Sequence, residues 1–184
     1  LVEAKGLSVA YGEKPVLEGL DFNLLRGERL ALLGRNGTGK SSILKLVLGE
    51  SVPHTGTLRR AGGLVLSSVP QRTDFLRGGL SGFAAQAGID ESLFKAILRK
   101  LGFARDQFEK PMEDFSSGQK KKVLLAKSLC ERAHVYVWDE PLNFVDVLSR
   151  IQIERLLCEF SPTMIFVEHD RAFVDSVATR VVQL

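Results

Sequence analysis

The chain has 184 residues, of which 45% are hydrophobic and 26% are charged, and its formal net charge is +3. These values exclude a disordered or fibrous chain and fit one globular domain with its own core. The mild excess of positive charge is compatible with a nucleic-acid partner but does not predict one.

Cysteine usage and hydropathy indicate the cellular compartment in which we expect the protein. Cys130 and Cys158 lie inside apolar helical patterns without metal-ligand or disulfide spacing, so we expect a reducing compartment and a cytoplasmic protein. No apolar run approaches the ~20 residues that a membrane-spanning helix needs, and no signal-peptide pattern opens the chain. Because the first residue is Leu1 rather than Met, we expect a piece of a longer protein.

The N-terminal part of the chain is predicted to be β-structure. Apolar and polar residues alternate at 7–11, 16–18 and 21–25, which predicts antiparallel strands separated by turns that contain Gly and Pro. The apolar run at 29–33 predicts a buried strand.

A glycine-rich loop follows this buried strand. It matches the phosphate-binding pattern of Gly, four residues and Gly-Lys-Ser/Thr, and apolar residues from 42 to 48 recur behind it at helical spacing. A strand, a glycine loop and a helix N-terminus together present backbone N–H groups to an anion. Lys40 would reach the β- and γ-phosphates, and Ser41 would ligate Mg²⁺. The alternative is a glycine-rich turn before an ordinary helix. The loop consists of Gly34, Arg35, Asn36, Gly37, Thr38, Gly39, Lys40 and Ser41.

Two further strands are predicted at 57–60 and 64–69, and the second ends just before Gln71. The pattern then becomes mainly helical, and we expect a helical subdomain at about 72–130. Within it, a helix capped by Asp90 extends to Leu101, and a short helical segment follows near 104–108. A loose stretch is predicted where four glycines occur, at Gly78, Gly79, Gly82 and Gly88.

A long helix is predicted from Ser117 to Glu131, with Ser116 as its N-cap. The free N–H groups at its start would form an anion site. The next three residues after Gln119 are lysines, and cations in the first turns of a helix oppose its dipole. An anion arriving from outside would relieve this conflict, but for at least two of the three lysines we expect a solvated basic face.

From residue 134 onward, strands and helices alternate. Strands are predicted at 134–138, 163–167 and 179–184, and helices at 147–158 and 170–177. This alternation predicts an α/β fold with a parallel sheet covered on both faces. In such sheets ligands bind beyond the carboxyl ends of the strands.

Five side chains outside the loop could carry chemistry. Asp139 would hold Mg²⁺ through water, and Glu140 could act as a general base. The Gln71 amide could ligate Mg²⁺ or position water, and His169 could hydrogen-bond a γ-phosphate or a catalytic carboxylate. Tyr11 could stack on a base. Each has a structural alternative: a pair of solvated acids, a surface Gln, a structural His or an ordinary strand Tyr.

Together, in this order, these motifs resemble the nucleotide-binding domain of an ABC ATPase across residues 1–184. The resemblance implies a P-loop α/β core with an antiparallel β-subdomain and a helical subdomain, and it implies ATP and Mg²⁺ as ligands. Tyr11 matches the A-loop, 34–41 the Walker A loop with Ser42 next to it, and Gln71 the Q-loop. Residues 115–119 match the family signature. The remaining matches are Asp139 in Walker B, the catalytic Glu140, Asp146 in the D-loop and His169 in the H-loop.

The resemblance also implies a partner. Two such domains face each other head to tail, and the signature of one contacts the ATP on the loop of the other. Ser116, Gly118 and Gln119 would therefore bind a partner's ATP, while a single chain carries two half-sites. The partner domain would belong to the same full-length chain or to a homodimer.

The D-loop segment Asp-Glu-Pro-Leu-Asn-Phe-Val-Asp at 139–146 is most similar to ABC-F proteins, which have two ABC domains and act on the ribosome. Some of them protect it from antibiotics. Two other hypotheses stay open, namely a motor domain of a membrane transporter and a nucleotide switch that does not hydrolyse ATP. The chain departs from the family patterns at Phe115, Ser117, Leu142 and Phe144, which puts the strength of the signature contacts in question.

Overall fold

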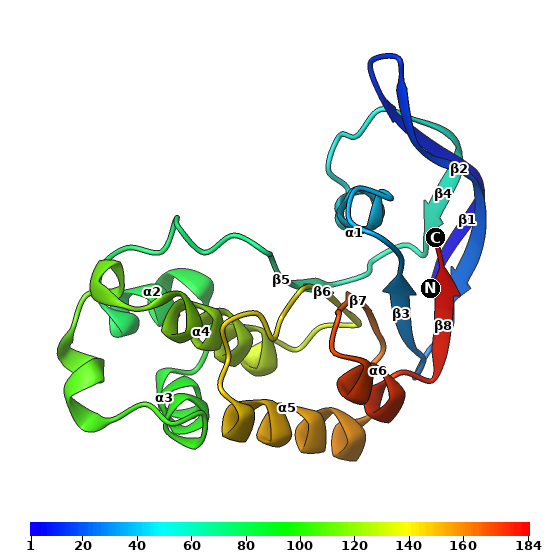
Figure 1. Ribbon diagram of the computed structural model, residues 1–184. Helices are drawn as coiled ribbons and strands as arrows, with labels where there is room; N and C mark the ends of the chain where they lie inside the picture. The colour runs from blue at the N-terminus through cyan, green and yellow to red at the C-terminus, as the bar shows by residue number, and fades with distance from the viewer.

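The fold is built on a five-stranded parallel sheet, seen in the computed structural model, which describes all residues from 1 to 184. Neighbouring strands pair in parallel throughout, and the three inner strands are short, mostly apolar runs, as expected for strands that are covered on both faces. The predicted parallel sheet is therefore confirmed (Figure 1). In spatial order the strands are β5 (Leu66–Val69), β6 (Val135–Asp139), β7 (Met164–Val167), β3 (Arg29–Leu33) and β8 (Arg180–Gln183).

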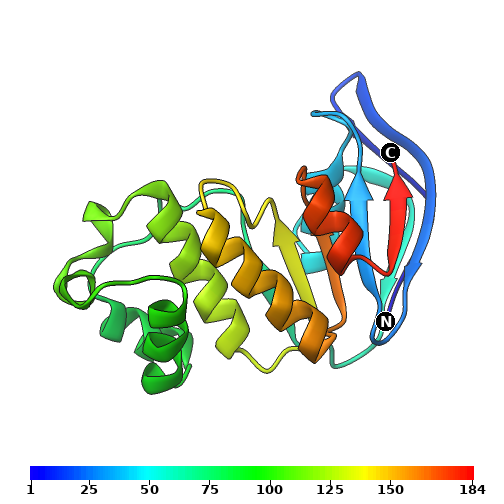
Figure 2. The ribbon, with the colours of Figure 1, turned by 60° about the horizontal axis from the view of Figure 1, so that its bottom comes forward.

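Alternate residues of this sheet belong to two separate hydrophobic cores. Leu30 and Ile165 lie in a core of 18 buried residues that includes helix α1 (Lys40–Leu48). Ala31 and Phe166 lie in a core of 25 buried residues on the opposite face. There the sheet is covered by the helices that stand in front of it in Figure 2, α4 (Ser117–Cys130), α5 (Val147–Phe160) and α6 (Arg171–Val177).

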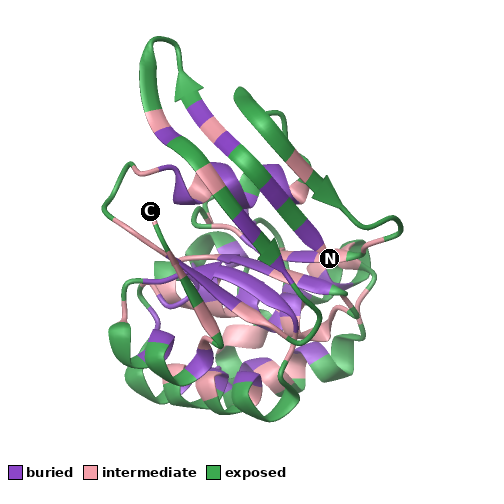
Figure 3. Ribbon diagram, turned by 90° about the vertical axis from the view of Figure 1, so that its right-hand side faces the viewer, coloured by how far each residue is buried: buried purple, intermediate pink, exposed green.

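A second, antiparallel sheet covers α1 on the side away from the parallel sheet (Figure 3). It has the order β2 (Lys14–Leu24), β1 (Val2–Tyr11) and β4 (His54–Arg60). The inward residues of β1, such as Val2 and Leu7, are buried, while their neighbours are exposed or half-buried. The predicted strands are thus confirmed, with one difference: 16–18 and 21–25 form one continuous strand, because the ladder between β1 and β2 continues across an irregularity near Leu20.

The helical part of the chain projects to one side of the sheet, at the left of Figure 1. It contains α2 (Leu80–Ala87), α3 (Glu91–Lys100) and the short 3₁₀ helices η1 (Arg105–Glu109) and η2 (Met112–Asp114). The helix capped by Asp90 is confirmed, because the Asp90 carboxylate accepts a hydrogen bond from Leu93 N at 2.6 Å.

The predicted loose stretch at 78–88 is wrong, because this stretch contains α2. Leu80 and Ala84 are buried on the same helix face, and Phe83 packs beside them. Gly79 and Gly88 flank the helix as its caps, and Gly88 adopts the left-handed conformation that commonly ends a helix. The glycines therefore mark the boundaries of a helix whose position is set by tertiary packing.

The longest helices, α4 and α5, have 14 residues each. None of the helices combines the length and the apolar character that crossing a bilayer would require.

Gly56 allows β4 to approach β1 closely. It has φ +80°, and a Cβ atom at this position would lie 2.3 Å from Gly6 O and 2.7 Å from Lys5 O. We expect Gly56→Ala to lower the free energy of unfolding by about 1–3 kcal/mol, because it adds both a backbone clash and a strained φ. Urea unfolding measures the effect. Gly62→Ala is the matched control, since a Cβ at Gly62 meets nothing within 4 Å; equal losses in the two variants would contradict the explanation.

Candidate functional site

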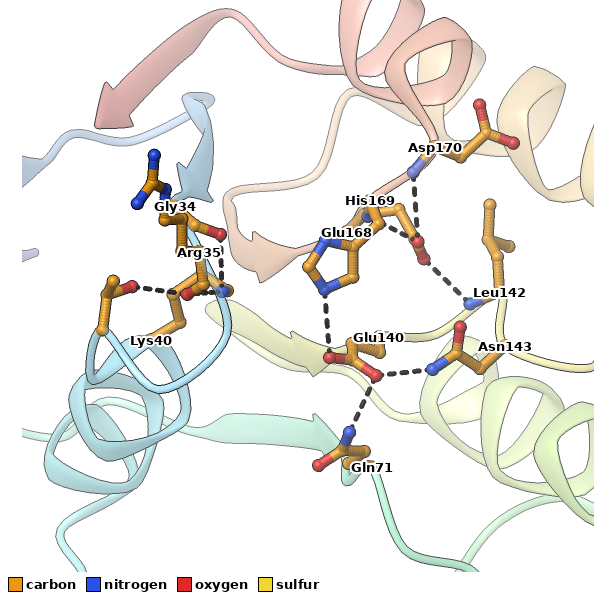
Figure 4. A network of polar contacts seen from close by, with 11 residues as sticks. Gly34, Arg35, Lys40, Gln71, Glu140, Leu142, Asn143, Glu168, His169 and Asp170 are labelled. Atoms are coloured by element: carbon orange, nitrogen blue, oxygen red, sulfur yellow. Dashed lines mark hydrogen bonds and ion pairs between the residues drawn. The ribbon is translucent and has the colours of Figure 1, made fainter. Parts of the chain in front are cut away.

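The loop between β3 and α1 is closed by a lysine from its own end. Lys40 Nζ donates to the carbonyl oxygens of Gly34 and Arg35, each at 2.8 Å, and Lys40 is buried. Thr38 Oγ1 donates to the same Arg35 carbonyl at 2.9 Å. Gly37 and Gly39 have φ of +82° and +88°, so the loop uses the left-handed conformations that glycine adopts without strain. Figure 4 shows Gly34, Arg35 and Lys40 in this compact turn at the N-terminal end of α1.

A cavity of about 570 Å³ opens beside this loop. Its lining brings together segments that are far apart in the sequence, from both sheets and from the ends of β5, β6 and β7. Of the predicted residues, Gly34 and Arg35 line a smaller cavity of about 260 Å³ next to it, together with Glu168 and His169. The larger cavity is lined by Tyr11, Lys14, Val16, Asn36, Gly37, Gly39, Lys40, Ser41, Ser42, Gln71, Glu140 and His169.

The carboxylate of Glu140 is the acceptor at the centre of the polar network in Figure 4. Its Oε2 accepts from Gln71 Nε2 at 2.7 Å and from Asn143 Nδ2 at 2.5 Å, and its Oε1 lies 3.2 Å from His169 Nε2. The Glu140 backbone is left-handed, with φ 48°, and its N–H donates to Val167 O at 2.9 Å. This unusual conformation holds the carboxylate between the strands β5 and β7.

Two members of the network were not predicted from the sequence. Asn143 lies within the segment that matches the D-loop, so its closeness to Glu140 could have been proposed. Glu168 is only 3% exposed, and its carboxylate accepts backbone N–H bonds from Leu142 at 3.1 Å and from His169 at 2.7 Å. A carboxylate that ends a buried strand and is satisfied by backbone donors ties together the loops after β6 and β7.

Asp139 is the last residue of β6 and lies next to Ser41, which lines the cavity. Burial raises the pKa of this carboxyl, against the Ser41 hydroxyl and the ammonium groups of Lys121 and Lys40, which favour its charged form. Its buried Oδ1 has no hydrogen-bond partner. A hard cation beside Ser41 would satisfy this oxygen, and the hydroxyl, amide and carboxylate oxygens available here are the donors that Mg²⁺ prefers.

Tyr11 stands at the edge of the cavity, with 49% of its surface exposed. Its hydroxyl is 2.9 Å from Ser42 Oγ on α1. This contact joins the antiparallel sheet to the first turn of α1, while about half of the tyrosine stays exposed beside the cavity.

The signature-like segment at the start of α4 does not line this cavity. Ser116 caps the helix through a reciprocal pair of bonds with Gln119, of 2.9 and 3.2 Å. Gly118 packs against the loop after β6 so closely that a Cβ would lie 2.2 Å from Phe144 O. Ser116, Gly118 and Gln119 are thus outside this cavity, which most of the other predicted residues line.

The expectation of a solvated basic face after Gln119 is wrong for two of the three lysines. Lys121 is 1% exposed, and Lys122 donates to Leu101 O at 2.6 Å and pairs with Asp146 at 2.5 Å. Only Lys120, half-buried and 3.3 Å from Glu113 O, stays near the surface. The ammonium groups of the buried Lys121 and the half-buried Lys122 are compensated by carbonyl and carboxylate oxygens, so both side chains are part of the packing of α4.

Comparison with known proteins gives consistent matches. A family model described as "ABC transporter" matches residues 17–143. The chain is 33% identical to the probable ATP-binding protein YbiT of Escherichia coli O157:H7 and 33% identical to the ATP-binding protein Uup of Caulobacter vibrioides, in both cases over its whole length. It is 29% identical to the ribosome protection protein VmlR of Bacillus subtilis over 95% of its length.

The chain spans about a third of the length of these curated relatives: 36% of YbiT and 32% each of Uup and VmlR. Among solved structures, the RNase-L Inhibitor superposes on the whole chain with a TM-score of 0.81 at 26% identity, and the chain covers 36% of it. An ATP binding subunit of an ABC transporter superposes with a TM-score of 0.79 at 24% identity, and the chain covers 85% of it.

The ion pair between Asp146 and Lys122 gives a pH-dependent prediction. Desolvation opposes ionisation of Asp146, but hydrogen bonds from Lys122 and Ser149 outweigh it and lower the pKa of the carboxyl. Such a group stabilises the fold above the ordinary Asp pKa of about 3.9, and this contribution is lost as the pH falls further. Because half of the side chain is exposed, solvent screening limits the contribution to about 1 kcal/mol.

We therefore expect Asp146→Asn to lower the free energy of unfolding by a constant amount between pH 7 and 5. The difference from the unmodified chain should shrink below about pH 4. Urea unfolding at a series of pH values measures it. Asp106→Asn, which removes an exposed pair with Lys110, is the control and should change far less. A pH-independent loss in Asp146→Asn would argue against the ion pair.

Proposed function

The chain belongs to the ABC transporter family of ATP-binding domains, with relatives of the ABC-F type, and on that premise we propose that it is one half of a head-to-tail ABC ATPase that acts on the ribosome. As an ABC domain it binds ATP and is a P-loop ATPase. The observation that carries the catalytic part of the proposal is the Glu140 carboxylate, held by three side chains at the wall of the cavity beside the phosphate loop.

In this proposal the ATP phosphates bind to the loop 34–41, with Ser42 adjacent, and the Lys40 ammonium supplies positive charge. Backbone N–H groups at the start of α1 add hydrogen-bond donors. Tyr11 stacks on the base, a role supported by its exposed position at the cavity edge.

The proposed cation is Mg²⁺, held by Ser41, by Asp139 through water and by Gln71. No group of three or more His, Cys, Asp or Glu side chains gathers anywhere in the structure in a way that could hold a metal ion. This agrees with Mg²⁺, which proteins usually hold with one or two carboxylates while the phosphates complete the coordination. The unpartnered Oδ1 of Asp139 supports the assignment.

Glu140 is proposed as the general base that orients and activates the attacking water. His169 and Gln71 hold its carboxylate in place, and His169, which lines the same cavity as the loop, is also proposed to contact the terminal phosphate. Positioning of this kind supplies most of the catalysis in phosphoryl transfer.

We further propose that Ser116, Gly118 and Gln119 serve the ATP of a second ABC domain, since they lie outside the cavity of this chain. Residues 1–184 would then form a single ABC domain, with a helical subdomain at about 72–130. The relatives, of which the chain spans about a third, leave room for a second domain in the same protein. A homodimer would serve the same purpose. An isolated chain would hydrolyse ATP slowly, because each of its half-sites lacks a partner.

The ribosome is the proposed target, through contacts with ribosomal RNA or protein, and antibiotic resistance is a proposed outcome. Support comes from the D-loop segment at 139–146 and from the similarity to VmlR, a ribosome protection protein. A ribosomal target and two free cysteines agree with a cytoplasmic location.

We expect Glu140→Gln to reduce ATP turnover by about 10²-fold or more while ATP binding persists, because the amide keeps the shape of the side chain but cannot accept a proton. Phosphate release and equilibrium binding of a fluorescent ATP analogue measure the two quantities. Glu109→Gln, at an exposed site in η1, is the matched control. Equal turnover in Glu140→Gln and the unmodified protein would refute the catalytic role and favour a nucleotide switch.

The ribosomal target is tested with the same variant in the intact protein. When hydrolysis is blocked, ATP should hold the closed state, so Glu140→Gln is expected to co-sediment with ribosomes in ATP and much less in ADP. Recovery with membranes instead of ribosomes would contradict the proposal and favour a transporter motor.

A further inference from the structure

Helix α4 carries a buried cation that the proposed catalytic roles do not use. Lys121 lies two residues after Gln119, and only 1% of its surface is exposed. Lysine is almost never fully buried unless its charge is compensated, because desolvating an ammonium group is costly. The contacts of this ammonium group therefore show what holds it inside.

Both hydrogen bonds of Lys121 go to one short piece of backbone. Nζ donates to Pro70 O at 2.9 Å and to Gln71 O at 3.1 Å. These two carbonyls lie just after β5, where the chain leaves the parallel sheet, and α4 packs against β5. A single side chain of α4 thus fixes the backbone from which the Gln71 side chain reaches Glu140 at 2.7 Å.

The charge of Lys121 faces the acidic side chains of the site. Burial lowers the pKa of Lys121, whereas the carboxylates of Asp139, Glu140 and Glu168 raise it. No carboxylate lies within 4 Å of its ammonium group in the structure, so the attraction acts across the packed interior. The ammonium group therefore makes a directional hydrogen bond to the Gln71 backbone and also attracts the carboxylates of Asp139, Glu140 and Glu168 electrostatically.

We propose that Lys121 is a positioning residue for ATP hydrolysis, acting through Gln71. By holding the carbonyl groups of Pro70 and Gln71 on α4, it keeps the Gln71 amide directed at the Glu140 carboxylate. This inference rests on the proposed function, because it assigns a task to Lys121 only if Glu140 and Gln71 serve hydrolysis.

The position of Lys121 on α4 gives the contact a second consequence. Ser116 and Gln119, which are proposed to meet the ATP of a partner domain, lie five and two residues earlier, at the N-terminal end of the same helix. Lys121 therefore links the end of α4 that is proposed to contact a partner's ATP to the backbone of Gln71 in the chain's own site.

A double-mutant cycle in the intact protein tests the proposal. Lys121→Met keeps most of the aliphatic stem but removes both hydrogen bonds and the charge, and Gln71→Ala removes the side chain that Lys121 is proposed to position. We expect Lys121→Met to lower kcat about tenfold, with nucleotide affinity unchanged within about twofold. The double variant Lys121→Met/Gln71→Ala should be no slower than the slower single variant, because both act on the same contact.

A purely structural role for Lys121 would give a different pattern. The losses in kcat would multiply in the double variant, or ATP binding would weaken in parallel with kcat, and either result would overturn the proposal. Lys120→Met is the matched control, since the neighbouring lysine is half-buried and its contact with Glu113 O is long, at 3.3 Å. If Lys121→Met does not fold, Lys121→Gln takes its place. Its shorter, uncharged side chain weakens the contact with the two carbonyls instead of abolishing it, so a smaller loss of kcat is expected, again with no further loss when it is combined with Gln71→Ala.

Glu140→Gln, assayed in parallel, distinguishes a failure of the proposed catalytic function from a failure of the role proposed for Lys121. If Glu140→Gln retains full turnover, the proposed catalytic function fails, and the task of Lys121 fails with it. If Glu140→Gln loses turnover while Lys121→Met retains the kcat of the unmodified protein, only the inference about Lys121 is wrong.

Discussion

The parallel register of four neighbouring strands is the constraint on which the rest of the site depends. Val69 of β5, Trp138 of β6 and Phe166 of β7 are aligned across the sheet, and Ala31 of β3 continues the same row. Two residues further along each strand, the chain reaches Gln71, Glu140, Glu168 and Leu33, the last of which precedes the phosphate loop. A shift of one residue in any pairing would turn these side chains to the wrong face and separate the network around Glu140.

The segment after β6 departs from regular structure to complete this arrangement. Glu140 and Phe144 both have positive φ, of 48° and 64°, although neither is glycine. Left-handed backbone costs about 1–2 kcal/mol at such residues. The cost is offset locally, because Glu140 N bonds to Val167 O and the Glu168 carboxylate accepts from Leu142 N. The parallel sheet and the buried Glu168 thus hold the loop in a conformation that it would not adopt on its own.

Local patterns were sufficient to predict the strands, the phosphate loop and most helices, because each depends on residues that are close in the sequence. They also indicated which side chains follow the strand ends, and the structure brings Gln71, Glu140 and His169 together as the parallel sheet requires. They failed for α2, whose position depends on packing of Leu80 and Ala84, and for Lys121 and Lys122. A lysine that faces buried carbonyls has the same local sequence as a lysine that faces water, so its burial follows only from the tertiary fold.

The contact between Gly118 and Phe144 O has a consequence for how this chain can vary among relatives. The atoms of Phe144 closest to a Cβ at position 118 are its carbonyl oxygen and carbon, and the nearest atom of its side chain, which is 78% exposed, is Cβ at 3.8 Å. Within the limit set by its positive φ, the side chain at 144 can therefore change without disturbing α4. Position 118, in contrast, has no room for even a methyl group. The two sides of this contact should therefore differ in the substitutions that they accept: position 144 on the loop accepts other side chains, whereas position 118 on the helix does not. Changes of the side chain at position 144 can then alter the surface that other molecules contact, while the loop and α4 remain packed against each other.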